Sequence, residues 1–258
     1  MKLKEKIKLF LQGFIMINVL WYLLAIIVDT RVLPTPIAVY LDLNNLYDNR
    51  LHIHILMSLY RVICGVGISL LLGVSVGLLM AYSKAWNKVL NPLVYFTYPV
   101  PKTALLPVAM LLFGLGDTSK VIIIVLILVF QVIIVVRDAV LNISPETYNP
   151  IRSLGASRLQ IFRYITLPAI LPAMLTNLRL SIGTALSILF FAEGYGTQFG
   201  IGYYILDAWT RIDYMGMYAG IVAISLFGFV LFVFSISFMP LLAVLMLISS
   251  VSLAFFSL

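Results

Sequence analysis

Six apolar stretches, each about as long as a membrane-spanning helix, limit what this chain can fold into. A helix that crosses a bilayer needs about 20 predominantly apolar residues. Charged residues make up only 10% of the chain, whereas soluble domains carry about 25%. The sequence therefore predicts an all-α, polytopic membrane protein with about six transmembrane helices in a lipid bilayer. The stretches lie at about 10–28, 57–81, 92–113, 119–136, 173–192 and 214–238.

The distribution of Lys and Arg predicts the orientation of these stretches. Cytosolic loops of membrane proteins carry an excess of Lys and Arg. With the N-terminus inside, the inner segments hold ten such residues and the outer segments hold four. The ten are Lys2, Lys4, Lys6, Lys8, Lys84, Lys88, Arg137, Arg152, Arg158 and Arg163, and the four are Arg31, Arg50, Lys120 and Arg211. The N-terminus is therefore predicted to be cytosolic, and the net charge of +7 does not indicate a nucleic-acid partner.

Three parts of the chain differ in composition. Residues 1–9 form a basic, cytosolic segment, residues 10–238 form the transmembrane domain, and residues 239–258 form an apolar tail. No residue from Tyr214 to Leu258 is charged, and one span uses only about 20–25 of these positions. Pro240 is expected to divide the tail, which is predicted to be either an extra span or a helix at the membrane interface.

A polar loop at residues 145–168 separates the fourth apolar stretch from the fifth. Ser144–Glu146 is expected to start a short helix that leads into it. Asn149 is a good N-cap because its side chain satisfies an unpaired N–H. A proline follows, and proline suits the first helical position. The sequence therefore predicts a helix at Pro150–Leu154, which ends at Gly155 because glycine readily adopts positive φ.

A second short helix is predicted later in the same loop. Ser157 and Gln160 have the spacing of a capping box for a helix at Arg158–Thr166. Pro168 and Pro172 are expected to interrupt the chain again before the fifth span. The loop is thus predicted to hold two short helices and a sharp turn. The alternative is an ordinary amphipathic loop whose arginines only fix the topology.

Prolines interrupt the third apolar stretch. Proline lacks an N–H donor and kinks helices. Inside a bilayer such breaks persist only where protein or water satisfies the freed backbone groups. The stretch is therefore predicted to line a solute path or the protein core. Lys102, near its middle, either attracts an anion, lies at the membrane edge or pairs with a neighbour. The prolines are Pro92, Pro99, Pro101 and Pro107.

Polar and small residues in the other stretches suggest how the helices pack. Arg61 is close enough to the outer end of the second span to reach the interface, and it is expected to have a structural role rather than to contact a substrate directly. Gly73 and Gly77 have the small-xxx-small spacing that lets another helix approach closely. The fourth stretch is either a lipid-facing or a packing helix. Glu193 ends the fifth span, where it is expected either to cap the helix or to have a functional role at the end of the span.

Motifs for catalysis and metal binding are missing from the sequence. There is no G-x4-G-K-[ST] loop, no G-x-S-x-G and no H-E-x-x-H, so no catalytic residue is predicted. His52 and His54 would share one face of a strand, but no Cys, Asp or Glu cluster completes a metal site. Cys64 has no cysteine to pair with in the chain. No metal and no disulfide are therefore predicted.

Two segments resemble the membrane subunits of ABC importers. Gly155–Pro168 reads G-x9-I-x-L-P, which resembles the second half of the EAA loop of those proteins. The first half departs, because Asn149–Ile151 is Asn-Pro-Ile where the family has Glu-Ala-Ala. The segment PVPKTALLPVAMLLFGLGDTSK at 99–120 is similar to the third-span region of nitrate/sulfonate/taurine-type permeases.

The resemblance implies a fold of the type I ABC-importer permease class and a set of partners. These are a second copy of the permease in a homodimer, cytosolic ABC ATPase subunits and an extracytoplasmic substrate-binding protein. The resemblance implies no cofactor in this chain, because ATP is bound by the ATPase subunits. The residues implied in coupling to the ATPase are Asn149, Pro150, Ile151, Arg152, Leu154, Gly155, Ala156, Ser157 and Arg158. The predicted translocation path holds Pro99, Pro101, Lys102, Thr103, Pro107 and Glu193.

The function implied is that of a membrane-spanning permease subunit without its own ATPase site. It would lie in the cytoplasmic membrane and couple ATP hydrolysis to uptake of a small anion such as nitrate, a sulfonate or taurine. The alternative is an ion-coupled secondary transporter. Such a carrier is expected to hold ionisable residues near the midplane and often two related halves. Lys102 is the midplane candidate, and no internal repeat is visible.

Overall fold

The computed structural model describes residues 3–42 and 50–256, which form helices and no strand. They belong to two compact units. Unit 1 comprises Met1–Ser58 and Thr197–Leu226, and unit 2 comprises Leu59–Gly196 and Phe227–Leu258. The elements are α1 (Leu3–Val28), α2 (Pro36–Leu41), α4 (Leu51–Tyr82), α5 (Lys84–Thr97), the 3₁₀ helix η1 (Lys102–Leu105), α6 (Leu106–Phe113), α7 (Asp117–Leu141), α8 (Pro145–Ser153), α9 (Arg158–Ile161), the π-helical turn η2 (Phe162–Thr166), α10 (Leu167–Glu193), α11 (Ile201–Thr210) and α12 (Tyr214–Phe256).

Five helical segments in the described part of the chain are long and apolar enough to cross a membrane. A sixth candidate is the pair formed by α5 and the η1–α6 segment, which are bent by 86° at the break between them. The prediction of an all-α protein with about six spans and a broken third span is therefore confirmed. The five segments are Phe10–Val28, Leu51–Tyr82, Asp117–Leu141, Arg158–Glu193 and Tyr214–Ser235.

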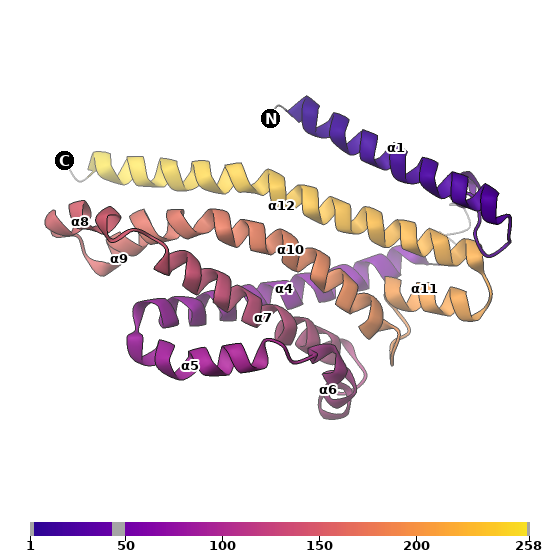
Figure 1. Cartoon of the computed structure of the whole chain (residues 1–258), viewed down its shortest axis with the longest axis horizontal. Helices are drawn as coiled ribbons and strands as arrows, with labels where there is room; N and C mark the ends of the chain where they lie inside the picture. Colours follow the sequence, from indigo (N-terminus) through magenta and orange to yellow (C-terminus); the bar gives the residue numbers. More distant parts are fainter. Residues whose placement is uncertain (1–2, 43–49, 257–258) are drawn as a thin grey trace. The chain divides into compact units, whose positions relative to one another are not determined.

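Helix α7 lies at the centre of unit 2. Ten of its residues are buried, and its Ile and Leu side chains form a core with residues of α4, α6 and α10. The Gln131 Nε2 atom donates a hydrogen bond of 2.9 Å to Oδ1 of Asn177 on α10. Figure 1 shows α10 running along α7, with α8 and α9 at one end of this pair and α6 toward the other. The fourth apolar stretch is thus a packing helix rather than a lipid-facing one.

Glycines on α4 allow it to approach α7 closely. A Cβ atom added at Gly73 would lie 2.5 Å from Cβ of Val132. A Cβ atom at Gly77 would lie 2.9 Å from the carbonyl oxygen of Ile133. Real side chains do not approach this closely. The prediction that this glycine pair serves tight helix packing is confirmed.

In unit 1 the two histidines lie on a helix and face different surroundings. Both belong to α4, where His52 is exposed and His54 is buried. The Nδ1 atom of His54 lies 3.1 Å from the backbone N–H of Gly200, and its ring stacks on that of Tyr203. The prediction that both histidines lie on one face of a strand is therefore wrong. The segment is a helix, in which residues i and i+2 point in different directions. His54 instead fixes the glycine-rich turn that precedes α11.

Helix α12 continues past Pro240 to Phe256. At 1.5 Å per residue, its 43 residues extend about 64 Å. The prediction that Pro240 divides the apolar tail is therefore wrong, because the helix continues through this residue. A proline within a helix removes one backbone hydrogen bond, but the backbone stays helical on both sides of Pro240. Its apolar candidate span is Tyr214–Ser235.

Candidate functional site

The polar loop forms an elbow at the start of α10, and the helix predicted to start at Ser144–Glu146 continues through the one predicted separately at Pro150–Leu154. Helix α8 runs from Pro145 to Ser153, with Ser144 at the N-cap position. Asn149 lies inside this helix, so the prediction of an N-cap at Asn149 is wrong. Proline at the first position and Glu146 in the first turn favour the earlier start, because proline is preorganised there and an acid suits the positive end of the helix dipole.

The turn at Gly155 is confirmed. Gly155 has φ of 76°, in the left-handed region that glycine adopts without steric cost. Its N–H donates to the carbonyl of Arg152 at 3.0 Å, and the N–H of Ala156 donates to the carbonyl of Ile151 at 3.2 Å. These two bonds are the paired contacts of a Schellman motif. They end α8 and reverse the direction of the chain.

The second short helix begins with the predicted capping box. The Ser157 N–H donates to Oε1 of Gln160 at 2.7 Å, and the Gln160 N–H donates to Oγ of Ser157 at 3.4 Å. The prediction that Pro168 and Pro172 interrupt the chain is wrong, because both lie within α10. The π turn η2 accommodates Pro168, whose ring would clash with the Tyr164 carbonyl in a regular helix.

Three hydroxyl groups connect the elbow to the end of α4, the second span. The hydroxyls of Tyr82, at the end of α4, and Thr166, at the end of η2, share a hydrogen bond of 2.6 Å. The Tyr148 hydroxyl of α8 lies 3.5 Å from Thr166 Oγ1. The guanidinium of Arg152 stacks over the Tyr148 ring at 5.3 Å. One buried threonine, Thr166, therefore contacts both α8 and α4 at the start of α10.

The predicted coupling residues lie together at the tip of this elbow. Leu154 is 85% exposed, and Leu159 is 74% exposed. Exposed apolar side chains beside basic ones are typical of a protein-binding surface. Among the predicted residues, Ile151 and Ala156 are half-buried, and the exposed ones are Asn149, Pro150, Arg152, Leu154, Gly155, Ser157 and Arg158.

Lys102 closes the break in the third span. It lies in η1 and is buried, and its ammonium donates to the carbonyls of Thr97 at 2.7 Å and Tyr98 at 3.1 Å. The same ammonium lies 5.0 Å from the centre of the Phe130 ring on α7. A cation at the C-terminal end of α5 satisfies its last carbonyls and complements the helix dipole. The other predicted path residues at the break are exposed, namely Pro99, Pro101, Thr103 and Pro107.

A cluster of four charged residues joins α4, α7 and α10. Arg61 is only 2% exposed, and its Nη1 atom donates to Oε1 of Glu193 at 2.5 Å. Its Nε and Nη2 atoms donate to Oδ1 of Asp117 at 2.8 and 2.6 Å. Lys120 is fully buried, donates to the Leu115 carbonyl and lies within electrostatic reach of the other three charges. The cluster is electrically balanced.

The cluster gives Arg61 a structural role. Its side chain is buried between two carboxylates that come from two other helices. Glu193 is completely buried, and this ion pair explains how a carboxylate is tolerated at the end of a span. Sequence reasoning missed this arrangement, although ionisable residues near span ends often pair with one another.

The sequence is similar to a known family of membrane transport subunits. Residues 69–257 match the family of binding-protein-dependent transport system inner membrane components. The chain is 32% identical over 71% of its length to the taurine transport system permease protein TauC of Escherichia coli, of which the match covers 67%. It is also 32% identical over 78% of its length to the putative aliphatic sulfonates transport permease protein SsuC of Bacillus subtilis, of which the match covers 74%.

Solved structures show the same fold at low sequence identity. An inward-facing MetNI methionine ABC transporter gives a TM-score of 0.63 at 17% identity, covering 72% of this chain and 93% of that one. A bacterial alginate ABC transporter in complex with an alginate pentasaccharide-bound periplasmic protein gives 0.58 at 18%, covering 91% and 96%. With its apolar helices and its family match, the chain is a multi-pass inner-membrane protein, and it belongs to the family of binding-protein-dependent transport system inner membrane components, the ABC importer permeases.

Proposed function

We propose that this chain forms the solute path of an ABC importer and couples ATP hydrolysis on separate ATPase subunits to uptake of a small organic anion. The observation that carries the proposal is the exposed elbow formed by α8, Gly155 and α9, which continues directly into the span α10. In this proposal the N-terminus and the elbow are cytosolic, as the excess of Lys and Arg on that side requires.

The tip of the elbow supports binding to a cytosolic ATPase subunit. It presents two leucines, Leu154 and Leu159, beside Arg152 and Arg158. Leucines this exposed are costly in water and favour burial against a protein partner. The arginines add charge-assisted hydrogen bonds to carboxylates of that partner. ATP binds to the partner, because this sequence has no phosphate-binding loop motif.

The contacts behind the tip support transmission of movement. Gly155 gives the elbow a sharp turn that the Schellman bonds define. Thr166 links α8 to α4 through the two tyrosine hydroxyls. Coupling between distant sites requires an element with two arrangements that both sites bias. In the proposal this element is the α8–η2 elbow, whose displacement tilts α10 against α4.

The solute and the remaining partners are proposed from the relatives. The printed names of two relatives refer to taurine and to aliphatic sulfonates. A small sulfonate-like anion is therefore the proposed solute. An extracytoplasmic binding protein delivers it, and a second copy of this chain completes the path. The family description and the alginate transporter complex with its periplasmic protein support the binding-protein partner.

The proposal is tested by reconstitution of the permease with its ATPase subunit and binding protein in proteoliposomes. We expect uptake of labelled taurine or ethanesulfonate. This uptake should require ATP on the side of the membrane where the ATPase subunits are bound. Gly155→Pro and Leu154→Asp should abolish uptake and weaken ATPase binding while the permease still inserts. Leu141→Asp, which changes another exposed leucine at the end of α7, is the matched control and should keep ATPase binding.

Two results would contradict the proposal. Uptake driven by an ion gradient without the ATPase subunit would support a secondary transporter instead. Normal ATP-driven uptake by Gly155→Pro would show that the elbow does not transmit movement.

A further inference from the structure

The α11–α12 turn of unit 1, residues 209–213, contains a strained residue. Ile212 has φ of 60°, in the left-handed region where a β-branched residue is an outlier. The N–H of Ile212 donates to the Trp209 carbonyl at 3.0 Å, and the N–H of Asp213 donates to the Ala208 carbonyl at 2.9 Å. These are the bonds of a Schellman motif, in which glycine usually occupies the position of Ile212. The elbow has Gly155 at that position.

Packing within unit 1 does not compensate for this strain. Ile212 is 70% exposed, and Trp209 is 58% exposed. A strained backbone persists only where the surrounding structure fixes it, and such residues cluster at binding and catalytic sites. Glycine or asparagine would form the same turn with less strain. The turn itself therefore does not require an isoleucine.

The helices on both sides hold the turn in place. Helix α11 buries one face, which includes Ile205 and Ala208. A Cβ atom added at Gly220 on α12 would lie 2.6 Å from Ile205 Cγ1, and Figure 1 shows α11 folded back against the start of α12. The Asp213 carboxylate accepts the Gly216 N–H at 2.9 Å. Such a preorganised surface loses little entropy when it binds a partner.

Charged groups accompany the two apolar side chains. Arg211 Nε lies 3.0 Å from Asp207 Oδ2, in a pair whose side chains are 55% and 37% exposed. Trp and Arg are enriched among the residues that dominate protein interfaces, where a polar rim surrounds an apolar centre. The carboxylates of Asp207 and Asp213 do not suit a surface of anionic lipid, because like charges repel. The composition of the turn therefore favours a protein partner over lipid headgroups.

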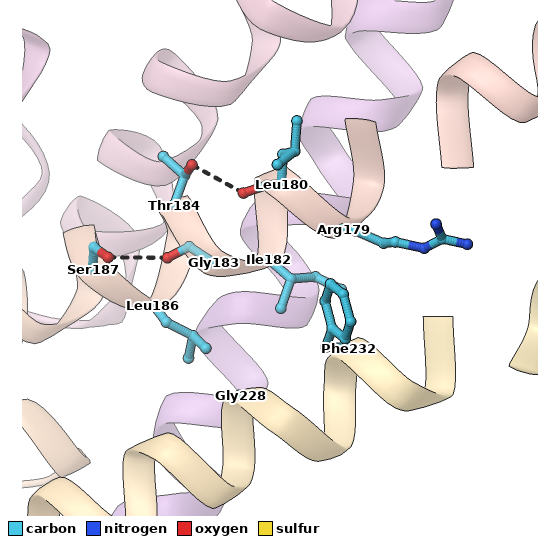
Figure 2. Close-up of a pocket in the computed structure, with 9 residues that line it drawn as sticks. All are labelled: Arg179, Leu180, Ile182, Gly183, Thr184, Leu186, Ser187, Gly228 and Phe232. Atoms are coloured by element: carbon cyan, nitrogen blue, oxygen red, sulfur yellow. Dashed lines mark hydrogen bonds between the residues drawn. The ribbon is translucent and has the colours of Figure 1, made fainter. Parts of the chain in front are cut away.

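The groove between α10 and α12 in unit 2 lacks this combination. Figure 2 shows its Thr184 and Ser187 hydroxyls donating to the carbonyls of Leu180 and Gly183 on the same helix, at 3.0 Å each. Arg179, which also lines the groove, has an interaction within the chain as well. The polar side chains of the groove are thus engaged, whereas the α11–α12 turn presents apolar and charged groups together.

The order of the spans predicts the side of the membrane on which the turn lies. Residues 194–213 connect α10 to α12, and both helices contain candidate spans. Helix α11 has 10 residues, about half the length that crosses a bilayer. This connection therefore stays on one side, opposite to the elbow that precedes α10. With the elbow in the cytosol, as the proposed function requires, the turn is extracytoplasmic.

We propose that the α11–α12 turn is a docking site for the extracytoplasmic binding protein. Trp209 and Ile212 enter an apolar pocket of that protein, and Arg211 pairs with a carboxylate at the edge of the pocket. Burial of the two apolar side chains offsets the strain at Ile212. This inference rests on the proposed import function and assigns a surface to one of its partners.

The test measures binding of the purified binding protein of the same importer, loaded with taurine, to the complete permease–ATPase complex in nanodiscs. Ile212→Asn removes the apolar side chain and introduces a residue that tolerates positive φ. It should weaken binding by roughly 10-fold or more. It should also raise the Tm of the purified chain by about 2–4 °C, because strain is relieved. These opposite effects distinguish a docking residue from one that only supports the fold.

Tryptophan and arginine variants test the rest of the surface. Trp209→Ala should also weaken binding by roughly 10-fold or more. Trp86→Ala, which changes another exposed tryptophan on α5, is the matched control and should leave binding unchanged. Arg211→Gln should slow association and reduce its dependence on salt. In proteoliposomes, the binding-protein concentration for half-maximal uptake should rise in Ile212→Asn by about the same factor as the dissociation constant.

A label in the turn separates a protein partner from lipid and from a second copy of the chain. In a Cys64→Ser background, Thr210→Cys places a thiol at an exposed position, which is labelled with bimane. The nanodiscs contain phosphatidylethanolamine and phosphatidylglycerol. The binding protein should shift the emission of the label, and doxyl-labelled lipid should leave it unquenched. The unlabelled thiols of two copies should not form a disulfide.

Any of four results would overturn the inference. They are unchanged affinity in both Ile212→Asn and Trp209→Ala, an equal loss in Trp86→Ala, a lower Tm in Ile212→Asn, and quenching by lipid or a disulfide at Thr210→Cys. ATP-driven uptake is measured in parallel on the unmodified complex. Normal uptake with unchanged affinity in the turn variants would overturn the docking site alone. Binding that depends on the turn, without ATP-driven uptake, would overturn the proposed import function and leave the docking site.

Discussion

Neutralising the two carboxylates that flank Arg61 should have very different effects on stability. Glu193→Gln and Asp117→Asn each remove one negative charge and preserve the shape of the side chain. Both residues bond to the same guanidinium. They differ in burial, since the side chain of Glu193 is fully buried and that of Asp117 is 37% exposed. The comparison therefore isolates the effect of burial on one ion-pair network.

The expected costs follow from that difference. Removing one partner of a buried pair costs about 3–5 kcal/mol, because the other charge stays behind without compensation. Exposed pairs contribute only about 0.2–1 kcal/mol. Glu193→Gln should therefore lower the free energy of unfolding by about 3–5 kcal/mol. Asp117→Asn should cost about 1 kcal/mol, because water replaces part of its contact.

Thermal unfolding of the purified chain in detergent measures both effects. For a chain of this size, 1 kcal/mol shifts Tm by about 2–4 °C. Glu193→Gln is thus expected to lower Tm by about 6–20 °C, and Asp117→Asn by about 2–4 °C. The Tm values of the two carboxylate mutants are compared with that of Asp207→Asn. This control removes one partner of the exposed Asp207–Arg211 ion pair at α11, outside the cluster, and should have little effect on Tm.

A double-mutant cycle then tests whether the cluster acts as a unit. Arg61→Gln or Glu193→Gln alone leaves one uncompensated charge in the cluster. Both changes together leave Lys120 and Asp117, which balance. The double mutant should therefore be more stable than the sum of the single effects predicts, by more than about 0.5 kcal/mol. Equal costs for Glu193→Gln and Asp117→Asn, or an additive cycle, would refute the reasoning.

Three further substitutions test local features by the same unfolding assay. Gly73→Val should cost about 1–3 kcal/mol by forcing α4 off Val132, whereas Gly67→Val, with nothing within 4 Å, should stay within about 0.5 kcal/mol. Gly155→Ala should cost about 1–2 kcal/mol from positive φ alone, since the space there is open. Lys102→Met should cost about 1–3 kcal/mol by leaving carbonyls at the break without a donor.

The features that the sequence predicted correctly are local. The positive φ at Gly155, the Ser157–Gln160 capping box and the tight approach at Gly73 each depend on residues a few positions apart. Apolar stretches of the length of a bilayer are recognisable for the same reason. The start of α8 at Ser144–Glu146 is confirmed. The separate helix start at Asn149 is wrong, because the helix that begins at Pro145 continues through it.

The missed features depend on long-range contacts or on subtle backbone geometry. Arg61 pairs with residues 56 and 132 positions away, and no spacing rule connects them. A signal was present nonetheless, because two cations and two carboxylates at the ends of apolar stretches require partners. The π turn η2 has no sequence signature beyond Pro168.

Helix α10 joins the elbow and the charged cluster within one unit. It begins directly after η2 and ends at Glu193. In the proposed mechanism the Arg61–Glu193 pair stays intact, because separating these two charges would cost about 3–5 kcal/mol. Movement at the elbow then tilts α10 about its Glu193 end.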